Sequence, residues 1–138
     1  MRILIVDDQD ETLRAMEAFL ARANVEMLSV NDSVEAARLI VTESFDAMFI
    51  DYLMPTHNGL QLTSMARKSP TNHATPIILI TGYDDVDTRN KGAEAGATYF
   101  LPKPFTPDKV RRVLANAVKN RPASPAPSFD IAREFVAY

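Results

Sequence analysis

The sequence contains no cysteine, which excludes disulfides and thiol chemistry and argues against structural zinc. It has no apolar run near the roughly 20 residues that a membrane-spanning helix needs, and the apolar part of its start, MRILIVDDQD, is too short for a signal-peptide core. Basic residues are not in excess: the net charge is −3 and the pI about 5.3, which argues against a broad nucleic-acid-binding surface. We therefore expect a soluble, cytoplasmic protein without direct nucleic-acid or membrane contacts.

The residues that are present suit one globular domain. The chain has 138 residues, of which 46% are hydrophobic and 24% charged. Short apolar runs of strand length alternate with longer amphipathic runs. The apolar runs are RILIV (2–6), VEMLSV (25–30), FDAMFI (45–50), PIILI (76–80) and ATYFL (97–101). Several are apolar on both faces, as expected for strands that helices cover on each side.

Helical periodicity fills the gaps between these runs. Apolar residues recur at spacings of three and four in the first, second and fifth gaps, and less regular helices are predicted over 60–67 and 84–95. The stripes are Leu13, Met16, Leu20 and Ala23, then Val34, Ala37, Ile40 and Val41, and last Val110, Val113, Leu114, Ala117 and Val118. Asp32 or Ser33 is the expected N-cap of the second helix. Five alternations of strand and helix predict an α/β layer fold with a parallel sheet and right-handed crossovers.

The composition changes after Lys119. Residues 120–128, NRPASPAPS, are rich in proline and predict an extended linker. Residues 129–138, FDIAREFVAY, place Phe129, Ala132, Phe135 and Val136 on one helical face. We therefore divide the chain into a domain at 1–119, a linker at 120–128 and a tail at 129–138. The tail is expected to be a short docking helix or the beginning of a further segment.

Acids, a hydroxyl and a lysine follow four of the five predicted strands. Asp7 and Asp8 follow the first, Asp51 the third, Thr81 the fourth and Lys103 the fifth. Each of these residues alone is more often a cap, turn or loop residue than a functional one. The carboxyl ends of parallel strands meet at one edge of a sheet, where ligands bind in this class of fold. The sequence therefore predicts that all five side chains converge there.

The convergence of three carboxylates suggests a phosphoryl-transfer site. Crowded carboxylates repel one another and recruit a cation. Oxygen ligands without histidine or cysteine favour Mg²⁺, with Mn²⁺ as the alternative. Lys103 could pair with a carboxylate or phosphoryl oxygen, and the hydroxyl of Thr81 could donate to a phosphoryl oxygen. Asp51 could then act as the nucleophile that forms an aspartyl phosphate.

In this combination the sequence resembles a response-regulator receiver domain, the phosphoacceptor of two-component signalling. The resemblance runs from about Arg2 to Lys119 and rests on ILIVDD, FIDYLMPTHNG, PIILITG and YFLPKPF, in that order. It implies a flavodoxin-like (βα)5 fold, a three-layer sandwich with sheet order 2-1-3-4-5. It also implies that Gly59 opens the third helix and that the Lys103–Pro104 peptide bond is cis.

The resemblance also implies roles for the site residues. Asp51 would be the phosphorylated residue, and Asp7, Asp8, Asp51 and the backbone carbonyl of Leu53 would hold Mg²⁺. Thr81 would be the switch hydroxyl and Lys103 the lysine that pairs with the phosphoryl group. The aromatic switch position falls on Phe100, for which a plain core role is the equal alternative. Leu53 and Tyr83 lie two residues beyond Asp51 and Thr81, where bulky side chains predict slow self-dephosphorylation.

The expected partners follow from the same resemblance. A histidine kinase or histidine phosphotransfer protein would donate the phosphoryl group, and a downstream protein or fused output domain would read the fourth helix, fifth strand and fifth helix. A homodimer is left open. The domain would promote its own phosphorylation and dephosphorylation and would not be a conventional enzyme.

Two alternatives come from other functional classes. One is a Mg²⁺-dependent phosphatase of the haloacid-dehalogenase type, for which Asp8-Gln9-Asp10 would supply the Asp-x-Asp pattern. That reading leaves Asp51 without a role. The other is a pseudo-receiver that binds partners without phosphorylation, and the intact set of site residues argues against it.

Overall fold

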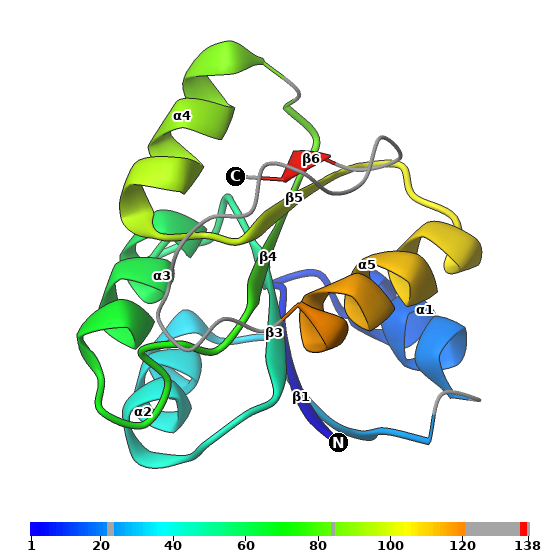
Figure 1. Cartoon of the computed structure of the whole chain (residues 1–138), viewed down its shortest axis with the longest axis horizontal. Coiled ribbons are helices and arrows are strands. Elements are labelled where there is room, and N and C mark those ends of the chain that lie inside the picture. Colours follow the sequence, from blue (N-terminus) through cyan, green and yellow to red (C-terminus); the bar gives the residue numbers. More distant parts are fainter. Residues whose placement is uncertain (22–23, 84, 121–135, 138) are drawn as a thin grey trace.

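The computed structural model describes residues 1–21, 24–83, 85–120 and 136–137. These residues form a six-stranded sheet with helices on both faces (Figure 1). The strands are β1 (Arg2–Val6), β2 (Glu26–Val30), β3 (Ala47–Asp51), β4 (Ile77–Thr81), β5 (Tyr99–Pro102) and β6 (Val136–Ala137). The helices are α1 (Asp10–Leu20), α2 (Ser33–Thr42), α3 (Gly59–Lys68), α4 (Val86–Ala95) and α5 (Pro107–Lys119).

The sheet has the order β2-β1-β3-β4-β5-β6. Strands β1 to β5 are mutually parallel, and β6 pairs antiparallel with β5. The predicted order 2-1-3-4-5 is therefore confirmed. The carboxyl ends of the five parallel strands all lie at one edge of the sheet, so this topology brings the predicted site residues to the same place.

Two apolar layers hold the helices to the sheet. Helices α1 and α5 cover one face, and α2, α3 and α4 cover the other (Figure 1). Strand side chains alternate between the layers, so Ile3 and Ile5 pack with α1 and α5 while Leu4 and Val6 pack towards α2 and α3. Every residue of β3 and β4 is buried. Such continuous burial explains why these strands read as unbroken apolar runs in the sequence.

Strands β3 and β4 each run one residue further than predicted. They end at Asp51 and Thr81, because the ladder continues through the pairs Asp51–Ile80 and Thr81–Pro102. Both of these predicted site residues therefore have a backbone that is fixed by sheet pairing. The sequence offers Asp32 or Ser33 as the N-cap of α2, and the structure shows that it is Asp32. Its side chain accepts a hydrogen bond from the N–H of Val34 at 3.0 Å. The predicted helix members Ala23 and Asp84 lie outside the described residues.

The end of the predicted tail is a strand and not a helix. Val136–Ala137 forms β6 on the outer side of β5, where an edge strand offers amide and carbonyl groups for pairing. The prediction of a helical face that includes Val136 is therefore wrong at this residue. Apart from Asn120, which is the C-cap of α5, the predicted linker lies outside the described residues, as do residues 129–135 and 138.

Among the described residues, no helix combines the length and apolar character that crossing a membrane requires.

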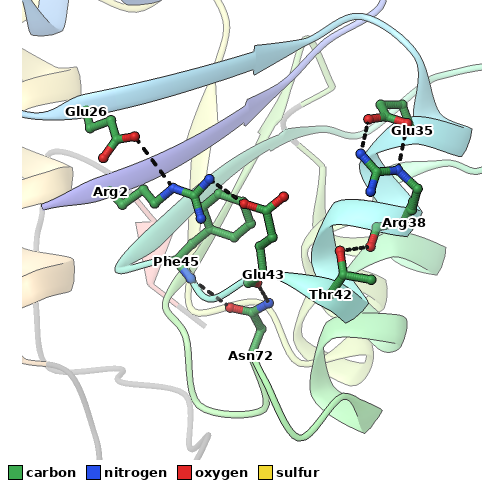
Figure 2. A network of polar contacts seen from close by, with 8 residues as sticks. All are labelled: Arg2, Glu26, Glu35, Arg38, Thr42, Glu43, Phe45 and Asn72. Atoms are coloured by element: carbon green, nitrogen blue, oxygen red, sulfur yellow. Dashed lines mark hydrogen bonds and ion pairs between the residues drawn. The ribbon is translucent and has the colours of Figure 1, made fainter.

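Asn72 joins its own loop to the end of α2 and the segment between α2 and β3, at the sheet end opposite the predicted site. Figure 2 shows its contacts with Glu43 and Phe45. Its side-chain N–H groups donate to the carbonyls of Ile40 at 2.6 Å and Glu43 at 2.7 Å, and its Oδ1 accepts the N–H of Phe45 at 3.1 Å. Close by, the Arg2 guanidinium pairs with Glu43 and lies 4.9 Å from the centre of the Phe45 ring. Asn72 is 1% exposed, so the groups that it satisfies have little access to water.

Asn72→Ala is expected to lower the free energy of unfolding by about 3 kcal/mol, because it leaves buried backbone groups without partners. Urea denaturation measures this loss. Asn31→Ala is the matched control, since Asn31 is exposed and makes one side-chain hydrogen bond, to Asp10 at 2.9 Å. The control is expected to change stability by about 0.5 kcal/mol or less. Equal losses in the two variants would contradict the prediction.

Helix α4 is held mainly at its C-terminal end. Its buried residues are Thr88 and Gly92, both small, and Val86 at its start is 66% exposed. At the other end Gly96 has a φ of 103°, and its carbonyl accepts a hydrogen bond from Arg67 Nε of α3 at 2.8 Å. A Cβ at residue 96 would lie 2.7 Å from Arg67 Cγ, so the left-handed conformation and the close approach both require glycine. Burial lowers the pKa of Arg67 to about 10.

Candidate functional site

Asp51 is held in place by the start of α3. The N–H of Gly59 donates to the carbonyl of Tyr52 at 2.9 Å, and a Cβ on Gly59 would lie 2.5 Å from the backbone oxygen of Asp51. Only glycine allows this approach. A capping box in which Asn58 and Gln61 exchange hydrogen bonds at 2.8 and 2.9 Å fixes the first turn of the helix. The prediction that Gly59 opens the third helix is confirmed.

Three carboxylates meet at the carboxyl edge of the sheet. Asp7, Asp8 and Asp51 each offer an oxygen, and these oxygens all lie within 4.8 Å of one another. Asp7 is 0% exposed and Asp51 is 6% exposed, whereas Asp8 faces solvent. Burial, followed by the charge of Asp7, raises the pKa of Asp51 to about 6. Burial also raises the pKa of Asp7, although the N–H of Gln9 donates to its Oδ1 at 2.8 Å.

Lys103 supplies the positive charge that reaches this cluster. Its Nζ lies 3.3 Å from Asp7 Oδ2 and 3.2 Å from Asp51 Oδ1. Burial opposes the charged form of Lys103, but the adjacent Asp51 and Asp7 carboxylates more than offset it, so the pKa of Lys103 is raised. The Lys103–Pro104 peptide bond is cis, as predicted.

Thr81 lies at the end of β4 beside the cluster and is 2% exposed. Its Oγ1 accepts the N–H of Tyr83 at 3.0 Å, which leaves its own O–H free to act as a donor. Phe100 is fully buried on β5 and packs in the layer that faces α2 and α3. This position fits both of its predicted roles and does not distinguish between them.

A cavity of about 510 Å³ opens over these groups. Its lining residues are Asp8, Gln9, Asp51, Leu53, Thr81, Gly82, Tyr83 and Lys103. The structure therefore brings together at one opening four of the five residues that the sequence singled out, Asp8, Asp51, Thr81 and Lys103. The fifth, Asp7, is buried and contacts the group through Lys103. Phe100 does not line this opening.

The donor set fits a divalent cation. All three acidic side chains offer hard oxygen ligands, and one ammonium group balances only one of their three charges. The raised pKa of Asp51 has the same origin, since its burial and the neighbouring charge of Asp7 penalise ionisation. A bound cation would relieve this penalty, and the acidic group is therefore a candidate metal centre.

The alternative Asp-x-Asp reading of residues 8–10 does not match this geometry. Asp10 is the first residue of α1, and its carboxylate accepts a hydrogen bond from Asn31 at 2.9 Å. The carboxylate that completes the cluster is that of Asp51 on β3. Nothing in this arrangement favours a phosphatase of the haloacid-dehalogenase type.

Two contributors to the site were not recognised in the sequence. The N–H of Gln9 orients Asp7, and Gly82 lines the cavity. The amide of Gln9 could not be assigned because any residue type can supply a backbone N–H. Gly82 carried a signal, since it follows Thr81 directly and small residues next to a strand end often border a binding site.

Comparison with known proteins identifies the family of the chain. Residues 3–115 match the response regulator receiver domain family. Protein PetR of Rhodobacter capsulatus is 37% identical over 119 residues, which cover 86% of this chain and 48% of PetR. Among solved structures, the receiver domain of sensor histidine kinase PA1611 from Pseudomonas aeruginosa has a TM-score of 0.80 and is 26% identical, and the match covers 86% of this chain and 98% of that domain. That structure has a magnesium ion coordinated in the active site cleft. Chemotaxis protein CheY4 of Vibrio cholerae has a TM-score of 0.79 and is 27% identical, and the match covers 84% of this chain and 97% of CheY4.

The chain therefore belongs to the response regulator receiver domain family. Its fold and its family are those of a phosphoacceptor in two-component signalling. The chain spans about half the length of the curated relatives that it matches.

The raised pKa of Asp51 predicts an unusual dependence of stability on pH. The pKa is about 6 in the folded protein and about 3.9 in an unfolded chain. Between these values the folded state binds more protons, so the free energy of unfolding falls as the pH rises through this window. Asp51→Asn removes the effect and is expected to stabilise the metal-free protein by about 2 kcal/mol at pH 7.

Urea denaturation of both proteins from pH 4 to pH 7 tests this prediction. The stabilisation by Asp51→Asn is expected to shrink towards zero near pH 4, where the carboxyl group is protonated in the folded protein. A difference that stays constant over this range would show that the charge of Asp51 is not its source.

Proposed function

We propose that Asp51 is the residue that accepts the phosphoryl group. Its carboxylate lines the cavity, on a strand end that sheet pairing and Gly59 hold in place. An oxygen of Asp51 forms a bond to phosphorus as the bond from phosphorus to the donor's histidine nitrogen breaks, and the electron pair returns to that nitrogen. The observation that carries the proposal is the grouping of Asp51 with Asp7, Asp8 and Lys103.

The remaining site residues receive roles that fit their positions. Asp7, Asp8, Asp51 and the backbone carbonyl of Leu53 would hold Mg²⁺, or Mn²⁺ in its place, and the ion would neutralise charge on the transferring group. Lys103 pairs with a phosphoryl oxygen in place of the Asp51 carboxylate. The O–H of Thr81 donates to another. These are positioning and electrostatic contributions, which dominate phosphoryl transfer. The domain in this way promotes reactions of its own Asp51 and has no separate substrate to turn over.

Phosphorylation would be read at the surface formed by α4, β5 and α5. The movement of Thr81 and Lys103 towards the phosphoryl group would change the balance between two arrangements of this surface, with Phe100 as the responding side chain. The donor would be a histidine kinase or a histidine phosphotransfer protein of the cytoplasm. A downstream protein, a fused output domain or a second copy of the chain would bind the switched surface.

Incubation with acetyl phosphate and Mg²⁺ tests the proposal. The intact mass is expected to rise by one phosphoryl group, with the label on the peptide that contains Asp51, and chelation of Mg²⁺ is expected to prevent it. Beryllofluoride with Mg²⁺ is expected to shift the amide resonances of Thr81 and Lys103. A spectrum unchanged by beryllofluoride would support the pseudo-receiver, and steady turnover of a generic phosphate ester would support the phosphatase.

The two side chains at the cavity mouth are expected to slow hydrolysis of the acyl phosphate. Leu53 and Tyr83 line the opening and are 52% and 56% exposed, so they stand between bulk water and Asp51. We expect a phosphoryl half-life of minutes or longer with Mg²⁺ present. Replacing both by alanine is expected to shorten it about tenfold, which corresponds to a barrier lowered by about 1.4 kcal/mol. A half-life of seconds in the unaltered protein would contradict the prediction.

A further inference from the structure

The outer side of β5 is occupied by the end of the same chain. Strand β6 pairs with β5 in the register Tyr99–Ala137 and Phe100–Val136. Figure 1 shows β6 at the edge of the sheet, next to β5 and between α4 and α5. Without β6, β5 would be the edge strand on this side of the sheet. Neither the family match, which ends at residue 115, nor the proposed role of Asp51 accounts for this strand.

The edge of β5 has a short set of groups to satisfy. Thr98 donates its N–H to Ile77 of β4 at 2.8 Å. Because the amides of a strand point alternately to its two sides, the N–H of Phe100 faces β4 and that of Tyr99 faces β6. By the same alternation the N–H of Leu101 also faces outward, whereas Pro102, at the end of β5, lies on the β4 side and has no N–H. A strand as short as β6 is therefore long enough to cover Tyr99, the first outward-facing amide of β5.

An uncovered β5 edge would be a template for pairing with another chain. Tyr99, Phe100 and Leu101 are all 0% exposed and give β5 a strongly apolar, β-favouring sequence. Edge strands of this kind associate with further strands unless a charge, a bulge or a covering segment prevents it. Here the covering segment is connected to α5 by residues 120–135 of the same chain. Pairing of the covering segment with β5 is therefore an intramolecular event, which is favoured over pairing with a separate chain.

We propose that strand β6 covers the outer edge of β5 and so blocks pairing of β5 with a strand from another molecule. The cover lies on the surface that we assign to signal readout, so a partner that pairs with β5 must first displace it. That consequence rests on the proposed function, whereas the cover itself does not. The tests below use unphosphorylated protein, so the cover and the role of Asp51 can fail separately.

Amide hydrogen exchange measured by NMR tests the cover. In a variant that ends at residue 135, the Tyr99 amide is expected to exchange at least about tenfold faster than in the full chain. The Phe100 amide faces β4 and is expected to keep its rate, which controls for general loosening of the fold. Ala137→Pro is expected to act like the truncation, and Ala137→Val, which favours a strand, to act like the unaltered chain. Equal protection of Tyr99 in the truncated and full chains would overturn the proposal.

The same measurement at two protein concentrations identifies the source of the strand. Protection of Tyr99 in the full chain is expected to be independent of concentration over a hundredfold dilution. Protection that falls on dilution would mean that the strand comes from a second copy, which would overturn pairing within one molecule.

Sedimentation equilibrium tests whether the strand prevents association. The chain that ends at residue 135 is expected to self-associate at a concentration at least about tenfold lower than the full chain or Ala137→Val. Loss of Tyr99 protection without any gain in self-association would show that β6 pairs with β5 but does not act as a cover, and would overturn the proposal.

Discussion

Asp51→Asn is expected to abolish phosphorylation of the protein. The amide that replaces the carboxylate is uncharged and a poor nucleophile, so the rate of phosphoryl incorporation from acetyl phosphate with Mg²⁺ is expected to fall by about 10⁴-fold or more. Intact-protein mass against time measures the rate. The loss cannot come from unfolding, because the same substitution is expected to stabilise the metal-free protein at pH 7.

Asp32→Asn is the matched control for this substitution. Asp32 is an exposed N-cap whose side chain accepts the N–H of Val34, and asparagine caps a helix as well as aspartate does. The control is expected to be phosphorylated at the rate of the unaltered protein. Incorporation into Asp51→Asn at that rate would place the acceptor on another carboxylate.

Gly59→Ala is expected to damage both the fold and the site. The added Cβ would lie 2.5 Å from the backbone oxygen of Asp51 and 3.0 Å from Tyr52 Cα, so either α3 or the end of β3 has to move. Forced overpacking against backbone is expected to cost about 3 kcal/mol of the free energy of unfolding. A displacement of Asp51 is expected to slow phosphorylation about 100-fold at a temperature where the variant remains folded.

Gly82→Ala separates this effect from the loss of a glycine as such. Gly82 also borders the site, but a Cβ built on it meets nothing within 4 Å. The free energy of unfolding of Gly82→Ala is expected to stay within about 0.5 kcal/mol of that of the unaltered protein. Urea denaturation of the two variants side by side checks the difference, and equal losses would show that the contact with Asp51 is not responsible.

The parallel sheet and the meeting of Asp7, Asp51, Thr81 and Lys103 at its edge could be predicted from the residues alone, whereas the strand order was implied by the resemblance to receiver domains. Apolar runs that alternate with helical stripes specify a parallel sheet, and a parallel sheet places the ends of its strands at one edge. Residues immediately beyond or at the end of such runs are therefore brought together by topology alone. The exact strand ends could not be predicted, because Asp51 and Thr81 are polar and sheet pairing extends through them.

Other features depend on contacts between distant segments. The close approach of Gly59 to Asp51 depends on how α3 lies against β3, and the bonds of Asn72 depend on two separate loops meeting. Neither leaves a periodic pattern in the sequence. The helical spacing of its apolar residues predicts that the tail is a short docking helix, with the beginning of a further segment as the alternative, but at Val136–Ala137 the open edge of β5 determines the structure. Tertiary context overrides local preference most readily in so short a segment.

The shallow packing of α4 implies that stability is distributed unevenly over the domain. This helix buries Thr88 and Gly92 and is tied to α3 by the hydrogen bond from Arg67 to Gly96, whereas β3 and β4 are buried throughout. Its local opening should therefore require much less free energy than global unfolding, so its amides should exchange early. A hydrogen bond to a charged group contributes about 1.5–3 kcal/mol. If Asp51 is phosphorylated as proposed, one hydrogen bond to its phosphoryl group can thus supply a free energy comparable to that which holds α4. Strands β3 and β4 stay intact.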